Sequence, residues 1–222
     1  MEIGGLFFGI GRYDAGMPGF ELEKACSGCV CGIDEVGRGP LAGPVLAAAV
    51  VLPQSLPESL LVAIDDSKKL SAAQRVDICA RLMALPGIAV GMGEADVAEI
   101  DRINILQATF LAMRRAFDAL PLVPQMALID GNRIPKGFPC KALAVVKGDG
   151  ISLSIAAASI IAKVRRDAIM AELAMEHPEY GWGANAGYGT PAHMAALEQF
   201  GATRHHRRSF APVSRVQGKL SF

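Results

Sequence analysis

Long helical segments alternate with short, β-branched runs along this chain, and that alternation limits the possible folds more than any other feature. Residues 95–120 carry apolar side chains at spacings of three and four, which predicts a long amphipathic helix. We expect further helices at residues 71–85, 151–176 and 191–200, the first capped by Ser71. Strand-like apolar runs occupy residues 30–34, 45–52, 88–93, 126–130 and 142–146. Strands that come first in a group and then alternate with helices predict an α/β domain with one mixed sheet, in which the first two strands are antiparallel neighbours.

The composition is typical of a folded globular domain. Of the 222 residues, 51% are apolar and 20% are charged, which excludes a disordered chain. We expect one domain at residues 29–213, an irregular glycine-rich extension at residues 1–28 and a short tail at residues 214–222. No run of 18 apolar residues occurs, and residues 1–10 lack Lys and Arg, so we expect a cytoplasmic protein with no membrane contact. Because nothing demands an oligomer, we expect a monomer.

The basic residues gather in two segments, although the formal net charge is zero. Residues 133–166 hold seven Lys and Arg against one acid, and residues 199–222 hold five with no acid. This distribution predicts a positive face beside a negative pocket, with residues 204–210 as a stripe for phosphate contacts. The alternative is ordinary solvated surface charge.

The cysteines and histidines do not predict a zinc site. Cys26, Cys29 and Cys31 offer three of the four ligands that structural zinc needs, with no His or second Cys pair nearby. His205 and His206 are adjacent in sequence, so their side chains point apart. We therefore expect reduced, partly buried thiols and no His-bound metal.

Four acidic residues stand at the ends of predicted strands. Asp34 and Glu35 end the first strand, Asp130 ends the fourth, and Asp149 follows the fifth. Strand ends of an open α/β sheet converge on one edge, where grouped carboxylates repel one another unless a cation neutralises them. Oxygen ligands without Cys or His favour Mg²⁺ or Mn²⁺, and a pair of such ions about 3.5–4 Å apart serves phosphodiester hydrolysis. Taken singly, each acid is an ordinary strand end or helix cap. Taken together, they favour a metal site.

Three further motifs suit a nucleotide ligand. The Gly37-Arg38-Gly39 turn lets the backbone approach a sugar closely, whereas Pro40 and the two preceding acids exclude a dinucleotide fingerprint. Lys68 and Lys69 precede a predicted helix N-terminus, a favourable place for phosphate. Tyr188 lies between two glycines, which frees its ring to face a ligand or, alternatively, to pack on the domain's own surface.

In combination, these segments resemble ribonuclease HII, the bacterial type 2 ribonuclease H. The resemblance covers about residues 28–213 and rests on GIDEVGRGPLAGPV, DSKKLS, EIDRINILQATFLAM, LIDGN, VKGD with SIAAASIIAKVRRD, GYGTPAH and HRRSFAPV. It implies a ribonuclease H-like fold, with a five-stranded mixed sheet flanked by helices and a helical C-terminal part. It also implies that residues 29–213 are the catalytic domain.

The resemblance assigns a role to each motif. Asp34, Glu35, Asp130 and Asp149 match the family's catalytic metal-binding carboxylates. Gly37, Arg38 and Gly39 match its reader of the ribose 2′-OH, Tyr188 matches the tyrosine that stacks on the deoxyribose at the junction, and Lys68 and Lys69 match its phosphate-contacting loop. The implied activity is hydrolysis of RNA in RNA–DNA duplexes, including a single ribonucleotide embedded in DNA. Cleavage on its 5′ side with Mg²⁺ or Mn²⁺ would leave 5′-phosphate and 3′-OH ends.

The sequence departs from the family pattern at two places. Ala186 stands where a lysine is expected, and Gly150-Ile151 replaces an alanine followed by a basic residue. Type 3 enzymes add an N-terminal substrate-binding domain and lack the junction tyrosine, whereas this chain has Tyr188 and no room for that domain before residue 28.

Two rival functions and one further partner are left open by the sequence. An integrase- or resolvase-like DNA nuclease would not need a 2′-OH reader, and a non-catalytic nucleic-acid-binding module would leave the four acids unexplained. At the C-terminus, Gln217, Leu220 and Phe222 form a loose match to peptides that dock on replication sliding clamps.

Overall fold

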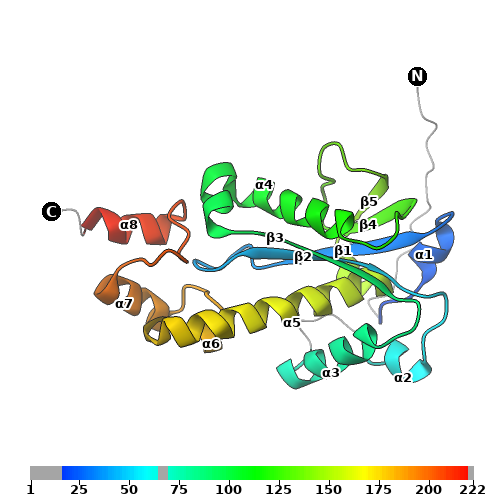
Figure 1. The fold of residues 1–222 in the computed structure, drawn as a ribbon, viewed down its shortest axis with the longest axis horizontal. Coiled ribbons are helices and arrows are strands. Elements are labelled where there is room, and N and C mark those ends of the chain that lie inside the picture. The colour runs from blue at the N-terminus through cyan, green and yellow to red at the C-terminus, as the bar shows by residue number, and fades with distance from the viewer. Residues whose placement is uncertain (1–16, 65–69, 220–222) are drawn as a thin grey trace.

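Five strands form one mixed sheet in the computed structural model, which describes residues 17–64 and 70–219 and, at residues 217–219, the backbone alone. The strands are β1 (Val30–Val36), β2 (Val45–Val51), β3 (Ala89–Ala95), β4 (Met126–Asp130) and β5 (Lys141–Val145). Their order is β3-β2-β1-β4-β5 (Figure 1). β2 is antiparallel to β1 and to β3, whereas β4 is parallel to β1 and to β5. The predicted mixed sheet and its antiparallel first pair are confirmed.

Helices cover both faces of the sheet (Figure 1). They are α1 (Glu21–Ala25), α2 (Glu58–Leu61), α3 (Ala72–Met83), α4 (Val97–Asp118), α5 (Leu153–Glu176), α6 (Trp182–Asn185), α7 (Pro191–Phe200) and α8 (Ala211–Lys219), with short 3₁₀ helices η1 (Gly148–Gly150) and η2 (Pro178–Tyr180). α4 lies on one face and α5 with α3 on the other, while α7 and α8 extend beyond one end of the sheet. Within the described part of the chain, none of these helices combines the length and the apolar character that a membrane crossing requires.

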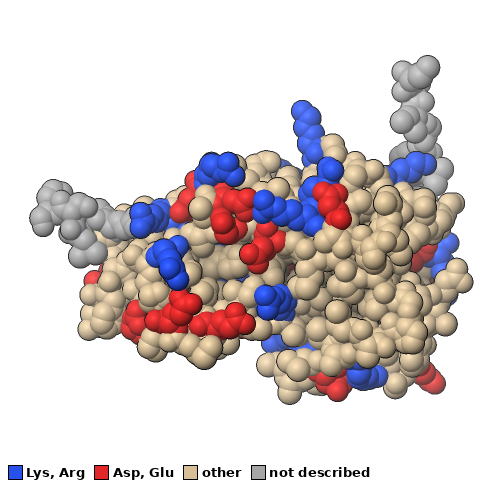
Figure 2. Space-filling model, in the orientation of Figure 1, with Lys and Arg blue, Asp and Glu red and all other residues tan. Residues whose placement is uncertain are grey.

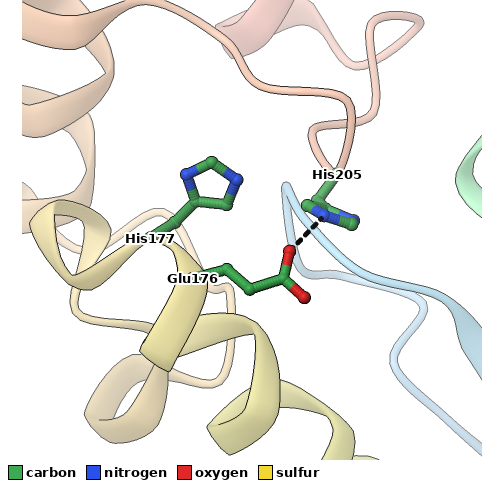
Figure 3. Close-up of side chains that lie close together, drawn as sticks. All are labelled: Glu176, His177 and His205. Carbon is green, nitrogen blue, oxygen red and sulfur yellow. Dashed lines mark ion pairs between the residues drawn. The ribbon is translucent and has the colours of Figure 1, made fainter.

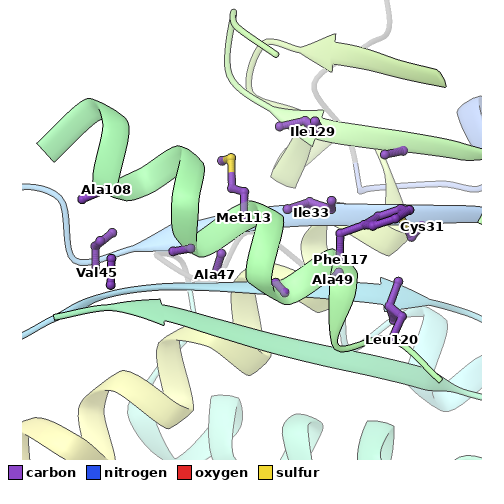
Figure 4. Packing of buried hydrophobic residues seen from close by; sticks show 14 of the residues in the cluster. Cys31, Ile33, Val45, Ala47, Ala49, Ala108, Met113, Phe117, Leu120 and Ile129 are labelled. Carbon is purple, nitrogen blue, oxygen red and sulfur yellow. The ribbon is translucent and has the colours of Figure 1, made fainter. Parts of the chain in front are cut away.

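The core beneath α4 is built from small strand residues and larger helix residues. Ile33 of β1 and Ala47 and Ala49 of β2 are fully buried against Met113 and Phe117 of α4 (Figure 4). Side chains alternate between faces along a strand, so the residues between these point to the α5 side. Asp34 is one of them, which places the predicted acid on the face that α5 covers.

The N-terminal end of α5 rests directly on β1. A Cβ atom added at Gly32 would collide with the backbone of Ser154 and Ile155, so only glycine permits this approach. The close packing brings η1, which precedes α5, next to the central strands. Gly32 therefore helps to set the position of the loop that carries Asp149.

Residues 17–28 are more ordered than the irregular extension predicted for residues 1–28. Gly19 forms a parallel bridge with Ser152, and α1 follows it. Oε1 of Glu23 accepts hydrogen bonds from the Ser152 hydroxyl (2.6 Å), the Ser154 N–H (2.9 Å) and the Ser154 hydroxyl (2.6 Å). A carboxylate at the first turn of a helix is favourable because the free N–H groups and the helix dipole attract it. Glu23 thus ties this segment to α5.

The long helix predicted at residues 95–120 is interrupted once. Asn104 has φ 67° and ψ 163°, which is not a helical conformation. Its Oδ1 accepts hydrogen bonds from the N–H groups of Leu106 (3.0 Å) and Gln107 (3.1 Å), as an N-cap does. α4 therefore consists of two helical pieces, and the apolar periodicity alone did not show the break.

Candidate active site

Parallel pairing of β1 with β4 brings the first three predicted acids together. Ile33 pairs with Ile129, so Asp34 and Asp130 occupy the next position on neighbouring strands, and Glu35 follows Asp34. Carboxylate oxygens of Asp34, Glu35 and Asp130 all lie within 4.8 Å of one another. Asp34 is only 5% exposed. The grouping expected at the strand ends is present for these three residues.

Asp149 lies beside this group without belonging to it at that distance. It occupies η1, directly after β5, and is buried. The preceding N–H, that of Gly148, donates a 2.7 Å hydrogen bond to Oδ1 of Asp130. The loop with Asp149 is therefore attached through its backbone to one of the three clustered carboxylates.

The grouped carboxylates are electrostatically unfavourable without a cation. Burial raises the pKa of Asp34 well above its usual range, and the charges of Glu35 and Asp130 raise it further. Burial also raises the pKa of Glu35, although the Arg38 guanidinium opposes this shift from 3.2 Å. Within the described part of the chain, Oε2 of Glu35 is buried with no hydrogen-bond partner. An unpartnered carboxylate oxygen among other acids fits a hard divalent cation, because the cation would supply the missing partner.

The glycine-rich turn and the tyrosine predicted to read substrate are in contact. A Cβ atom added at Gly39 would lie 3.3 Å from Cε1 of Tyr188, so the ring rests on the glycine backbone. Tyr188 remains 48% exposed. The carbonyl of Gly187 accepts a hydrogen bond from the N–H of Leu41 (2.8 Å), which joins the two loops. Lys68 and Lys69, the predicted phosphate contacts, lie outside the described residues.

A cavity of about 360 Å³ opens beside the carboxylates. Glu35, Arg38 and Asp130 line it together with Asn132 and Arg133, which follow β4. Leu106, Thr109, Phe110 and Met113 of α4 form the opposite wall. The sequence interpretation did not assign these α4 residues, Asn132 or Arg133 to the site. The LIDGN motif was the available signal, since it places Asn132 two residues after a predicted ligand.

The predicted phosphate stripe at residues 204–210 is wrong for one of its arginines. Arg207 is fully buried and donates to backbone carbonyls, so it cannot reach a phosphate. Arg204 pairs with Glu176 instead, with 3.1 Å between its Nη2 and Oε2. On the face drawn in Figure 2, acidic and basic side chains are interspersed, and no patch of one sign covers it. The charge count failed because it contains no information about which side of a loop faces inward.

A second group of possible metal ligands is better explained by an arginine. Glu176, His177 and His205 have ligand atoms within 4.8 Å of one another, and Glu176 points toward His205 (Figure 3). Arg204, however, donates both to Oε2 of Glu176 (3.1 Å) and to Nε2 of His205 (3.0 Å). The guanidinium therefore already supplies the positive charge and uses the nitrogen lone pair that a metal would need.

A chain of buried ring hydrogen bonds ends on the backbone of Tyr188. The N–H of Thr203 donates to Nδ1 of His206 (3.0 Å), which leaves the His206 proton on Nε2. That Nε2 donates to Nε2 of His193 (3.1 Å), and Nδ1 of His193 donates to the carbonyl of Tyr188 (2.8 Å). As expected from their adjacency, His206 points inward while His205 points toward Glu176.

The two departures from the family pattern fall in different environments. Ala186 has φ 49° and lies in the left-handed region, and its carbonyl accepts a hydrogen bond from Arg166 (2.9 Å). A Cβ atom at Gly150 would meet nothing within 4 Å. Ile151 packs against the buried cluster of Val30, Leu128 and Ile155. Each substitution is accommodated without touching the grouped carboxylates.

A five-stranded mixed sheet with carboxylates grouped at the ends of β1 and β4 defines a metal-dependent nuclease of the ribonuclease H-like fold. The profile of the family described as "Ribonuclease HII" matches residues 31–213. The chain belongs to the ribonuclease HII family.

Individual relatives agree with this assignment. A "Ribonuclease HII" of Rhodospirillum rubrum is 64% identical over 198 residues, covering 89% of this chain and 90% of the relative. The crystal structure of ribonuclease H2 from Pyrococcus horikoshii matches with a TM-score of 0.72 at 26% identity, covering 86% of this chain and 98% of that one. The structure of a PCNA:RNase HII complex from Archaeoglobus fulgidus matches with a TM-score of 0.69 at 24% identity, covering 85% and 96%, and so shows the shared fold.

The family membership establishes the class of reaction. The chain is a ribonuclease H, an endonuclease that acts on RNA–DNA hybrids, and the family depends on a divalent metal. This decides against the DNA nuclease and the non-catalytic binding module considered from the sequence. The predicted fold and the predicted enzyme class are confirmed.

Proposed function

We propose that this ribonuclease H cuts at the RNA–DNA junction, on the 5′ side of a ribonucleotide, and accepts a single ribonucleotide embedded in DNA. The observation that carries this proposal is the contact between the exposed ring of Tyr188 and the backbone of Gly39, next to the carboxylate group. The backbone of the glycine-rich turn and the ring of Tyr188 lie in one surface. This surface can contact two consecutive sugars, one with and one without a 2′-OH. Such a site serves the removal of ribonucleotides and RNA primers from DNA.

Asp34, Glu35, Asp130 and Asp149 are the residues that would hold divalent cations, Mg²⁺ or Mn²⁺, in this proposal. When bound, the cations supply the activation of water and the stabilisation of the departing 3′ oxygen that leave 5′-phosphate and 3′-OH ends. The protein's own part is to hold these carboxylates in place. Gly148 does so for Asp130 through its N–H, and Arg38 does so for Glu35 through its guanidinium.

Substrate recognition falls to the neighbouring loop. Among the described residues, the N–H groups of Arg38 and Gly39 have no hydrogen-bond acceptor, so both can donate to a ribose hydroxyl. Tyr188 would stack on the deoxyribose that follows, and Lys68 and Lys69 would contact a phosphate further along. Discrimination comes from the 2′-OH, because deoxyribose has no hydroxyl at that position for these donors to bind.

Three labelled duplexes test this function: DNA alone, DNA with one embedded ribonucleotide, and a full RNA–DNA hybrid. Each is incubated with Mg²⁺, Mn²⁺ or EDTA, beside the Asp34→Asn variant. We expect metal-dependent cutting on the 5′ side of the single ribonucleotide, no cutting of plain DNA, and no activity in the variant. Cutting of the hybrid alone would contradict the junction reading while leaving ribonuclease H activity intact.

We also propose that the C-terminal tail binds a sliding clamp. The solved Archaeoglobus relative is a complex of RNase HII with PCNA, and Gln217 of this chain falls in the last turn of α8. Leu220 and Phe222, the other two residues of the motif, lie outside the described residues. A peptide of residues 213–222 should bind a bacterial clamp in fluorescence anisotropy, and no binding at high micromolar clamp would end this proposal. The monomeric state and the cytoplasmic location stay predictions.

A further inference from the structure

Two arginine side chains lie buried beneath the Gly37–Gly39 turn, and no step proposed above uses them. Arg166 of α5 and Arg207, which precedes α8, are each 0% exposed. Among the described residues, neither has a carboxylate within ion-pair distance. Burying a charge without an ion-pair partner costs free energy. The hydrogen bonds of each guanidinium therefore indicate which part of the structure it supports.

Arg207 binds the carbonyl side of the turn. Its Nη2 donates to the carbonyl of Gly37 (2.6 Å) and its Nη1 to that of Arg38 (3.0 Å). The same side chain reaches the carbonyls of Gly43 (2.9 Å) and Pro44 (3.1 Å) on the other side of the loop. One rigid guanidinium therefore fixes both ends of residues 37–44.

Arg166 joins this loop to the segment that carries the tyrosine. Its Nη2 donates to the carbonyl of Ala42 (3.1 Å) and its Nε to that of Pro44 (3.1 Å). Its Nη1 donates to the carbonyl of Ala186 (2.9 Å), two residues before Tyr188. Together with the hydrogen bond from the Leu41 N–H to the Gly187 carbonyl, this side chain sets the separation between the turn and the ring.

The glycine at the start of the turn leaves room for the Arg166 side chain. Gly37 has φ +92°, and a Cβ atom there would collide with Nε of Arg166 and approach its Cδ to 2.7 Å. The requirement for glycine at this position therefore includes room for Arg166 and for the carbonyl of Pro44, which would lie 2.9 Å from the Cβ atom, in addition to the backbone conformation.

The two buried arginines orient the turn and place positive charge behind it. With the carbonyls of Gly37 and Arg38 drawn inward, the free N–H groups of Arg38 and Gly39 are left for a ligand. Burial lowers the pKa of Arg166 to about 10 and that of Arg207 to about 9, so both stay protonated at neutral pH. Asp167 acts on Arg166, and Asp101 on Arg207, only from beyond ion-pair distance. The two positive charges lie behind donors that face a polyanion, where the low dielectric strengthens their effect.

We propose that Arg166 and Arg207 are positioning residues that set the geometry and the positive potential of the junction-reading surface. The inference rests on the proposed junction function, because it assigns a role to the support of that surface. Neither residue touches substrate. Their effect on cleavage is exerted through Gly37–Gly39 and Tyr188.

Steady-state kinetics of Arg207→Lys and Arg166→Lys test this role, because lysine keeps the charge and loses the fork of donors. We expect KM for the single-ribonucleotide duplex to rise about tenfold, the effect of losing about 1.4 kcal/mol of hydrogen bonding, and kcat on the long hybrid to change less than about twofold. Stabilisation by Mn²⁺ in a thermal melt should be retained. Arg165→Lys, a neighbouring exposed arginine, is the matched control and should match the wild type.

The amide signals of the turn provide a second measurement that does not depend on activity. In ¹⁵N-labelled protein, the N–H resonances of Arg38 and Gly39 should shift in Arg207→Lys and stay in place in Arg165→Lys. Unchanged resonances together with a wild-type KM would overturn the proposal, as would equal losses on both substrates that follow the folded fraction. If the wild type cuts only long hybrids, the junction function alone is refuted, and a raised KM for the hybrid in Arg207→Lys then still supports the positioning role.

Discussion

The ring of Tyr188 lies against the backbone of Gly39, and the two residues come from loops separated by almost 150 positions in the chain. The Leu41 N–H and the Arg166 side chain hold these loops together from below. The contact makes the tyrosine part of a surface that already contains the free donors of the glycine-rich turn. Ring and turn are therefore expected to act on substrate as one unit.

Removing the ring should selectively weaken cutting at a single ribonucleotide. We expect Tyr188→Ala to lower kcat/KM on that duplex by about 1–2 kcal/mol, which is about five- to thirtyfold, because ring stacking of this kind contributes about 1–3 kcal/mol. Tyr188→Phe keeps the ring and should stay near the wild type. Equal activity of the alanine and phenylalanine variants would argue against a stacking role.

Glycine is needed at position 37 for two reasons, a positive φ and a steric collision with Arg166. Two alanine variants can separate these contributions. Gly37→Ala should destabilise the fold by about 2–5 kcal/mol, since it combines a strained φ with overpacking against Arg166. Gly137→Ala also forces a positive φ, +68°, but a Cβ atom there meets nothing within 4 Å. It should cost only about 1–2 kcal/mol. Urea unfolding of both variants gives the free energies to compare. Equal losses of stability would mean that the Arg166 side chain moves aside without a free-energy cost.

Neutralising one carboxylate should stabilise the metal-free protein. Because burial and the neighbouring acids raise the pKa of Asp34, its ionised form opposes folding, and this cost grows as the pH rises. In EDTA at pH 8 we expect Asp34→Asn to raise Tm by about 2–4 °C, which corresponds to about 1 kcal/mol. In Mn²⁺ the wild type should gain stability and the variant should gain less. A lower Tm for the variant in EDTA would show that Asp34 is not electrostatically strained.

The buried histidine pair should make the protein acid-labile. Burial, with added repulsion from His193, lowers the pKa of His206 to about 3 from its usual 6.5. The folded state needs the neutral ring, so its stabilisation is present above pH 6.5 and is lost as the pH falls from there toward 3. The free energy of unfolding should decrease by about 1.4 kcal/mol per pH unit from this group below pH 6. His206→Gln should flatten that slope, and His177→Gln, at a partly exposed position, serves as the control.

Glu23 should contribute to the stability of the whole domain. Glu23→Ala removes the acceptor for three donors at the start of α5, and we expect a loss of about 1–3 kcal/mol in the free energy of unfolding. Glu21→Ala, on the exposed side of the same short helix, should cost less than about 0.5 kcal/mol. Similar losses in the two variants would mean that α1 is bound to the domain by other contacts.

The sequence by itself determined the elements that are long enough to show a period. The strands, the helices α3, α5 and α7 and the span of α4 were all predictable, because burial on one face repeats every two residues in a strand and every 3.6 in a helix. Asp34, Glu35 and Asp130 were predictable as a group for a related reason, since strand ends in a parallel pair must meet. The short helices α2 and α6 span four residues each, too few for any period, and Asn104 breaks α4 without breaking its apolar pattern.

Only the tertiary structure decided which charged residues face inward. Arg166 and Arg165 are neighbours in one basic run, yet the first is buried beneath the glycine-rich turn and the second is exposed. Arg207 likewise belongs to a run that predicts surface cations, but its partners are carbonyls of a loop more than 160 residues away in sequence. Every residue has a backbone carbonyl, so the sequence does not show which carbonyls will accept hydrogen bonds from a buried side chain. A charge that is satisfied by them therefore cannot be recognised until the chain has folded around it.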